Sequence, residues 1–246
     1  SHWEGLDSLS NIVVLGDSYS KSHEGKTWVE FLGQLLSNLP GRESPKIYNF
    51  AFPGASVEEG DLAEQVSSIL VSKRLTPTVH EHQESGDALW SSPRRTTYCS
   101  SLRSHTSRAN PDSNLSFVER VFDALHDLYT RAGARSFVVV DVPPTDRSPS
   151  AINFEMSDEM EGRICAWNTL LTKQAREFGT TYSEATLLLV SSHNILSDIL
   201  DDPAKFDFTE DDVAAEGGGI WADILHLTEE VHEVLAEQVL IALSVK

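Results

Sequence analysis

Basic residues and cysteine are scarce in this sequence of 246 residues. Only 19 Lys and Arg stand against 38 Asp and Glu, which gives a formal net charge of −19 at pH 7 and a pI near 4.7. Because binding to nucleic acid or to anionic lipid needs clustered cations, this balance excludes both as main partners. Two cysteines, Cys99 and Cys165, allow at most one disulfide. A disulfide scaffold and a Cys-based zinc site of the usual kind are therefore excluded.

Long apolar runs are also missing. No run approaches the roughly 20 residues that a membrane helix needs. Residues 1–5 lack the basic and then apolar order of a signal peptide, and the compartment is left open, either cytoplasmic or secreted after removal of an upstream leader. Hydrophobic residues make up 40% of the chain and charged residues 23%. These values are ordinary for a globular protein, and we expect one domain over residues 1–246.

Short apolar strands alternate with amphipathic helices along most of the chain. Asn11–Leu15 predicts a buried strand, and apolar residues at three- and four-residue spacing predict a helix from Trp28 to Leu39. Further strands are predicted over 46–50, 136–142 and 185–190, and further helices over 62–71, 117–129, 160–178 and from Thr228, the expected N-cap of the last helix. This order predicts a parallel sheet that is covered by helices on both faces.

The segment Thr76–Asn114 breaks this alternation. Its 39 residues include 13 Ser or Thr and only 8 apolar residues, too few to offset the entropy of ordering. We interpret it as a loop or a disordered segment. Loops of this length are uncommon inside compact domains, which leaves a wrong assignment open. A shifted reading frame or a misassigned splice site is a further hypothesis for its composition.

Ser18 is the first residue that suggests chemistry. It lies in Gly16-Asp17-Ser18, directly after the first predicted strand. In an open parallel sheet, ligands bind outside the carboxyl ends of the strands, where Ser18 would lie. By position alone, a serine before a helix is more often an N-cap. Ser18 needs a neighbouring base to become a nucleophile.

Asp223 and His226 are the candidates for that support. They lie three residues apart just before the last predicted helix. In a turn, the Asp223 carboxylate could accept the Nδ1–H of His226 and leave Nε2 to take a proton from a serine hydroxyl. A bare Asp-x-x-His pattern is more often a cap or a surface pair, but the order Ser first and His last adds weight.

Three segments now resemble one known family, the GDSL or SGNH hydrolases, and within it the fungal acetylesterase-like carbohydrate esterases. Val14–Ser20 is similar to the family's first block, which holds the nucleophilic serine. Tyr48–Ser56 resembles the second block, whose glycine donates a backbone N–H to an oxyanion, here Gly54. Trp221–Thr228 resembles the last block, which supplies the Asp and His. Residues 137–144 and 194–203 are also family-like, so the resemblance covers about 1–75 and 117–246.

The resemblance implies a three-layer α/β/α fold of flavodoxin-like type. It implies Ser18, Asp223 and His226 as a catalytic triad and the N–H groups of Ser18 and Gly54 as the oxyanion hole. It implies no metal and no cofactor. The expected function is a serine esterase acting on small O-acyl esters, with acetylated sugars as candidate substrates. The oligomeric state is left open.

One family block is not found. The third block should follow a strand and supply an asparagine to the oxyanion hole, but Thr76–Asn114 occupies its place. Gly86-Asp87 lacks the asparagine, and Asn110 and Asn114 lack the glycine context, so none is assigned. We therefore expect a sheet in which one central strand is missing or distorted. A catalytically impaired relative is one alternative function.

Weaker patterns give further alternatives. A flavodoxin-like binding module would hold a phosphate with Ser18, Ser20 and Ser22. His80, His82, His105 and Cys99 could imitate a metal site, but chance histidines in a polar segment are the better interpretation. The acidic residues between Asp207 and Glu216 lack the spacing of a calcium loop and indicate a solvated loop. Gly217–Gly219 indicates a flexible approach to Trp221 rather than a phosphate loop.

Overall fold

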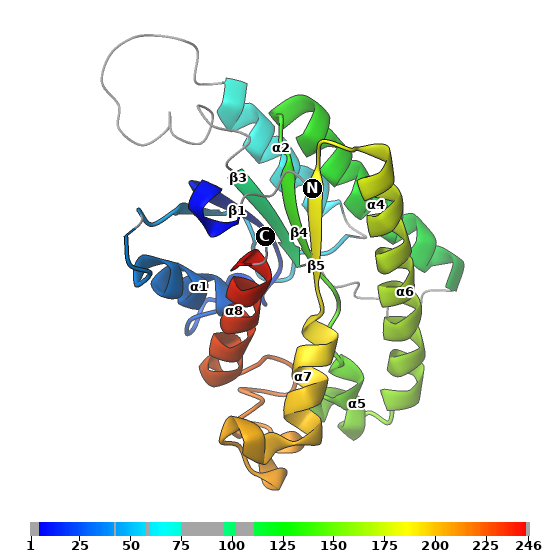
Figure 1. Cartoon of the computed structure of the whole chain (residues 1–246). Coiled ribbons are helices and arrows are strands. Elements are labelled where there is room, and N and C mark those ends of the chain that lie inside the picture. The colour runs from blue at the N-terminus through cyan, green and yellow to red at the C-terminus, as the bar shows by residue number, and fades with distance from the viewer. Residues whose placement is uncertain (1–4, 42, 58–59, 75–95, 102–110, 245–246) are drawn as a thin grey trace.

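The computed structural model describes residues 5–41, 43–57, 60–74, 96–101 and 111–244. Five parallel strands form one sheet in the order β2-β1-β3-β4-β5 (Figure 1). The strands are β1 (Asn11–Gly16), β2 (Lys46–Asn49), β3 (Thr96–Ser101), β4 (Ser136–Val140) and β5 (Thr186–Val190). This is the flavodoxin-like strand order, whose topological switch point lies between β1 and β3. The predicted α/β fold with a parallel sheet is confirmed.

Helices cover both faces of the sheet and make the three layers. One face carries α1 (Trp28–Ser37) and α8 (Glu229–Ser244), and the other carries α2 (Asp61–Arg74), α4 (Pro111–Asp127) and α6 (Ser157–Thr181) (Figure 1). At the carboxyl end of the sheet, α7 (Ser192–Asp201) follows β5. The remaining elements are α5 (Pro149–Asn153), a π-helical turn (Leu128–Ala132) and short 3-10 helices (Leu6–Ser8, Thr145–Arg147, Pro203–Phe206, Glu210–Val213).

The central position of β1 explains its unbroken apolar sequence. Ile12 and Val14 point into the core beneath α1 and α8, whereas Val13 and Leu15 point into the core beneath α2, α4 and α6. All four side chains are fully buried. Each such burial contributes about 1.5–3 kcal/mol. The residues that follow β1 therefore project from a strand that is buried along its whole length.

The structure corrects the interpretation of Thr76–Asn114 as a loop. Within it, β3 lies in the middle of the sheet and pairs with both β1 and β4, with Gly16 opposite Ser101. The expectation of a missing central strand is therefore wrong. Ladder hydrogen bonds join backbone groups, so a polar strand can be held between two neighbours although its composition suggests a loop. Residues 76–95 and 102–110 lie outside the described residues.

Most of the predicted helices are present close to their expected bounds, and α5 and α7 are helices that were not predicted. Thr228 caps α8 as expected, because its Oγ1 accepts the N–H of Val231 at 3.4 Å. By contrast, α4 begins at Pro111 rather than Phe117. In the part of the chain that the structure describes, no helix is both long and apolar enough to cross a membrane.

Candidate active site

Ser18 lies in a turn just beyond the carboxyl end of β1. The turn is closed by the N–H groups of Ser20 and Lys21, which both donate to the carbonyl of Asp17 at 3.1 Å. The N-cap alternative for Ser18 is wrong, because α1 begins only at Trp28 and is capped by Thr27. Ser18 is half-buried, so its hydroxyl is held by the protein and can still meet a ligand.

His226 reaches this turn from the other end of the chain. Its Nε2 lies 3.1 Å from the Oγ of Ser18, and its Nδ1 lies 2.7 Å from the Oδ2 of Asp223. Both distances are within hydrogen-bond range. The structure thus brings together the three residues that the sequence singled out, in the order Ser, His, Asp that nucleophilic catalysis requires.

The carboxylate of Asp223 also shapes the loop that carries His226. Its Oδ1 accepts the backbone N–H groups of Leu225 and His226, both at 2.7 Å. Burial raises the pKa of Asp223, but these N–H groups and the His226 ring outweigh burial and hold the pKa below its usual value. Asp223 is therefore ionised at neutral pH and fixes both the backbone and the ring of His226.

Tyr19 joins the Ser18 turn to the His226 loop. Its backbone N–H donates to the Oδ1 of Asp17 at 2.9 Å, and its phenol O–H donates to the carbonyl of Leu225 at 2.9 Å. Its ring lies 6.3 Å from the ring of His226 and 6.1 Å from that of His232. Tyr19 is buried, so these contacts fix the relative position of the two loops.

His232 lies behind the site, on α8. It is 5% exposed, and its Nδ1 has no hydrogen-bond partner among the described residues. Burial, with a smaller contribution from the nearby charge of His226, lowers the pKa of His232 to about 4. His232 is therefore neutral at physiological pH. A neutral ring here places no second positive charge beside His226 when that residue takes up a proton.

Gly54 lies in the turn that follows β2, the neighbour of β1 in the sheet. Its φ of +83° is in the left-handed region that favours glycine. Apart from Gly54 and its two chain neighbours, no atom of the described residues lies within 4 Å of the position that a Cβ would take there. A ligand can thus approach the backbone of Gly54 closely.

The two other serines of the first turn are engaged elsewhere. Ser20 is fully buried, and its Oγ accepts a hydrogen bond from the Nε1–H of Trp28 at 3.3 Å. The hydroxyl of Ser22 donates to the carbonyl of Glu24 in its own loop. The alternative of a phosphate cradle made of Ser18, Ser20 and Ser22 therefore has no support in the geometry.

The other weak candidates have different outcomes. His80, His82 and His105 lie outside the described residues, and Cys99 is described only as part of the β3 backbone.

Between Asp207 and Glu216, Asp212 accepts hydrogen bonds from Thr209 and from the N–H of Gly219. Gly219 is thus held in place rather than flexible. Among the described residues, no three His, Cys, Asp or Glu side chains gather as a metal site would require.

The third oxyanion donor expected from the family would follow β3. That strand ends at Ser101, and residues 102–110 lie outside the described residues. Gly86, Asp87 and Asn110 also lie outside them, whereas Asn114 is in the first turns of α4.

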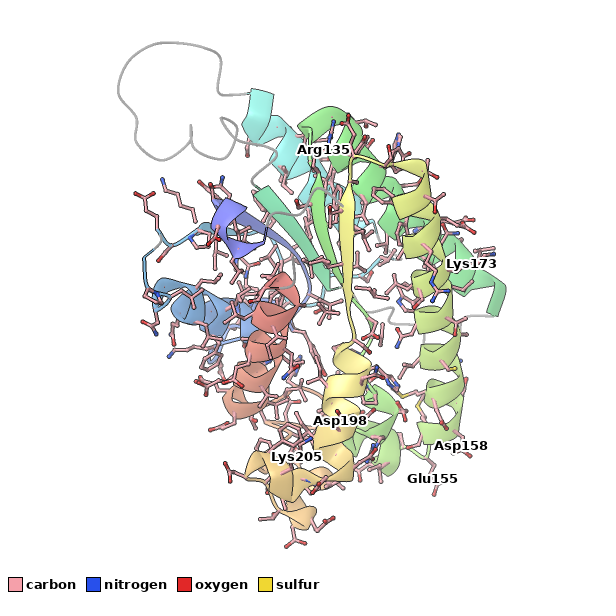
Figure 2. The ribbon with its side chains drawn as sticks, in the orientation of Figure 1. Arg135, Glu155, Asp158, Lys173, Asp198 and Lys205 are labelled. Atoms are coloured by element: carbon pink, nitrogen blue, oxygen red, sulfur yellow. The ribbon has the colours of Figure 1, made fainter. Side chains whose placement is uncertain are left out.

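Exposed acidic side chains lie at the end of the molecule toward which the strands run. Glu155, Asp158 and Asp198 are exposed and lie at the end of the molecule where α7 follows β5 (Figure 2). Lys205 is at the same end, and Arg135 lies at the opposite end, before β4. Exposed carboxylates and a lysine thus share this end of the molecule, in a chain whose net charge is −19.

Comparison with protein families decides the classification. The model of the GDSL-like lipase/acylhydrolase family matches residues 12–239. The chain belongs to this family. Members of this GDSL family are acyl-ester hydrolases, and the match spans all three segments in which the site residues lie. None of the curated proteins compared with the chain matches it.

Several solved structures share the fold at low sequence identity. A catalytic mutant of Axe2, an acetylxylan esterase from Geobacillus stearothermophilus, aligns with a TM-score of 0.61 and 10% identity over 96% of this chain and 95% of that chain. A second Axe2 variant aligns with a TM-score of 0.62 and 11% identity over 96% of each chain. A candidate GDSL-like lipase from Parabacteroides merdae aligns with a TM-score of 0.57 and 13% identity, over 97% of this chain and 98% of that chain.

Proposed function

We propose that this protein is a serine esterase that hydrolyses small O-acyl esters through Ser18, His226 and Asp223. The observation that carries the proposal is the 3.1 Å contact between Ser18 Oγ and His226 Nε2, together with the 2.7 Å contact between His226 Nδ1 and Asp223. A serine hydroxyl is a weak nucleophile unless a base takes its proton, and His226 is placed to do so.

Acylation follows from this arrangement. His226 Nε2 takes the proton of Ser18 as Oγ forms a bond with the ester carbonyl carbon. The ionised carboxylate of Asp223 stabilises the imidazolium and holds its Nδ1–H in place. When the tetrahedral intermediate collapses, the bond to the alcohol oxygen breaks and His226 gives that oxygen the proton. The alcohol leaves, and the acyl group remains on Ser18.

The oxyanion needs donors during this step. The backbone N–H groups of Ser18 and Gly54 are the proposed donors, since both follow the carboxyl ends of neighbouring strands. Removing one oxyanion donor typically costs on the order of 100- to 1000-fold in turnover. An enzyme without the asparagine donor of the family would therefore keep its triad and turn over slowly.

Deacylation repeats the same chemistry with water. His226 takes a proton from a water molecule, the water oxygen attacks the acyl carbon, and the bond to Ser18 Oγ breaks as His226 returns the proton. The products are a carboxylic acid and the free enzyme, with no cofactor in the cycle.

Acetyl esters are the proposed substrates, including acetyl groups on sugars. Support comes from the likeness of the first, second and last blocks to fungal acetylesterase-like enzymes. Further support comes from the fold shared with Axe2, which is named as an acetylxylan esterase. A small acylated molecule also suits the acidic surface better than a polyanion does.

The test is hydrolysis of p-nitrophenyl acetate by the wild-type protein and by Ser18→Ala. We expect turnover by the wild type and none above background by Ser18→Ala, with unchanged circular dichroism. Hydrolysis of p-nitrophenyl butyrate, compared with that of p-nitrophenyl acetate, then tests the preference for acetyl groups. Release of acetate from acetylated xylan tests whether acetylated sugars are substrates. A correctly folded wild-type protein without any ester hydrolysis would favour the impaired alternative instead.

A further inference from the structure

The last residue of β1 is held by a side chain from α2. Gln65 is 3% exposed, and its Oε1 accepts the N–H of Gly16 at 2.9 Å while its Nε2–H donates to the carbonyl of Gly16 at 2.9 Å. These contacts cross 49 residues of sequence. One amide group thus pairs both backbone groups of a residue that lies two positions before Ser18.

The two hydrogen bonds from Gln65 lie where β1 extends further than β2. The pairing of β1 with β2 ends at Val14 opposite Asn49, whereas the pairing with β3 continues to Gly16. On the β2 side the N–H groups of Phe50 and Phe52 still donate to the carbonyls of Val14 and Gly16, at 2.8 and 3.3 Å, so the carbonyl of Gly16 keeps a backbone partner there. The side-chain amide of Gln65 has the same donor and acceptor as a peptide group. It therefore gives the N–H of Gly16 an acceptor and gives the carbonyl of Gly16 a second donor beside Phe52.

We propose that Gln65 is a positioning residue for the nucleophile. By closing both hydrogen bonds of Gly16, it fixes the end of β1 and hence the place of Ser18 relative to His226. The inference rests on the proposed role of Ser18. Because a shift of about 1 Å in a reacting group can cost on the order of 100-fold in rate, a clamp two residues away acts on turnover.

The structure contains a matched control for this contact. Asn168 on α6 binds both backbone groups of Val142 in the same way. Its Oδ1 accepts the N–H of Val142 at 3.0 Å, and its Nδ2–H donates to the carbonyl of Val142 at 2.9 Å. Val142 follows β4, and neither it nor Asn168 belongs to the proposed catalytic machinery. Asn168→Leu removes the same kind of contact without loosening the Ser18 turn.

The experiment compares Gln65→Leu, Asn168→Leu and wild type in p-nitrophenyl acetate hydrolysis, with thermal unfolding of each. We expect Gln65→Leu to lower kcat by about 10- to 100-fold with KM within about twofold, and Asn168→Leu to keep kcat within about threefold. Equal losses of kcat in both variants would overturn the proposal. A wild-type protein without activity would instead overturn the proposed function, so the two failures are distinguishable.

A second variant keeps the test valid if Gln65→Leu does not fold. In Gln65→Glu the introduced carboxyl is nearly the same shape, and when protonated it again offers one donor and one acceptor. Burial raises the pKa of such a carboxyl. We therefore expect the ratio of its kcat to that of the wild type to rise as the pH falls from 8 toward 5.5. A ratio that is constant over this range would contradict a role in positioning.

Discussion

Ser18 and His226 are 208 residues apart in the sequence, yet their side chains lie 3.1 Å apart. The fold explains the meeting. The strand that precedes Ser18 is central in the sheet, and α8, which begins just after His226, packs with α1 on one face of that strand. The start of the last helix therefore lies next to the end of the first strand. Neither loop needs to move for the contact to form.

Replacing Asp223 by asparagine should lower turnover without unfolding the protein. The amide cannot stabilise the imidazolium and favours the wrong tautomer of His226. Such a change costs about 10⁴-fold where the carboxylate is buried, and because Asp223 is 49% exposed we expect a smaller loss, on the order of 10²- to 10³-fold. Steady-state kinetics with p-nitrophenyl acetate measures it. A variant within threefold of wild type would show that Asp223 is not needed.

Removing the phenol O–H of Tyr19 should loosen the connection between the two catalytic loops. Tyr19→Phe keeps the ring but loses the hydrogen bond to the carbonyl of Leu225. We expect a loss of about 1 kcal/mol in the free energy of unfolding, measured with urea, and a lower kcat. Tyr182→Phe is the control, since Tyr182 bonds His126 on the exposed surface of α4. Equal kcat values for the two variants would refute a link through Tyr19.

The buried His232 should make the protein less stable in acid. Its pKa in the folded state is about 4, below the ordinary value of 6.5, so the unfolded state binds more protons between these values. Its contribution to stability is fully present above pH 6.5 and is lost as the pH falls to about 4. The loss amounts to about 3 kcal/mol.

Urea unfolding of wild type and His232→Leu at pH 7.5 and pH 4.5 measures this contribution. We expect the variant to lose less stability than the wild type between the two pH values. Parallel losses in the two proteins would mean that His232 is not the group responsible.

The acidic surface should slow reactions with anionic esters. With a net charge of −19 and exposed Glu155, Asp158 and Asp198 at the end that carries Ser18, a negative substrate is repelled on approach. At low ionic strength we expect kcat/KM for 4-acetoxybenzoate to be about tenfold below that for the neutral 4-acetoxybenzamide. The gap should narrow at 0.5 M salt, because salt screens these charges. A difference in kcat/KM that salt does not change would contradict this electrostatic explanation.

Local patterns predicted most of the fold. The unbroken apolar sequence of β1 and the cap at Thr228 depend on near neighbours in the chain, and both predictions are confirmed. By contrast, β3 was missed because its place depends on backbone pairing with β1 and β4 rather than on side-chain hydrophobicity. For α7, the spacing of Ile195, Leu196, Ile199 and Leu200 and the proline at 203 were available signals.

The supporting residues of the site could not be predicted in the same way. Gln65 and His232 are polar residue types that are mostly exposed in proteins, yet both are buried in line with the apolar residues of their helices. Their partners, Gly16 and the Tyr19 ring, are distant in the sequence and adjacent in the structure. Only the three-dimensional arrangement identifies such long-range contacts. Ser18, Asp223 and His226 were predicted from their places beside predicted strand and helix ends together with the resemblance of their segments to the GDSL family.

The most direct measurement is the site and rate of modification by a fluorophosphonate, followed by intact mass and peptide mapping. Such reagents react with a serine that a neighbouring base activates. We expect one adduct per chain, on Ser18, with a rate that falls at least about 100-fold in His226→Ala while circular dichroism is unchanged. An adduct on another residue, or equal labelling of wild type and His226→Ala, would contradict it.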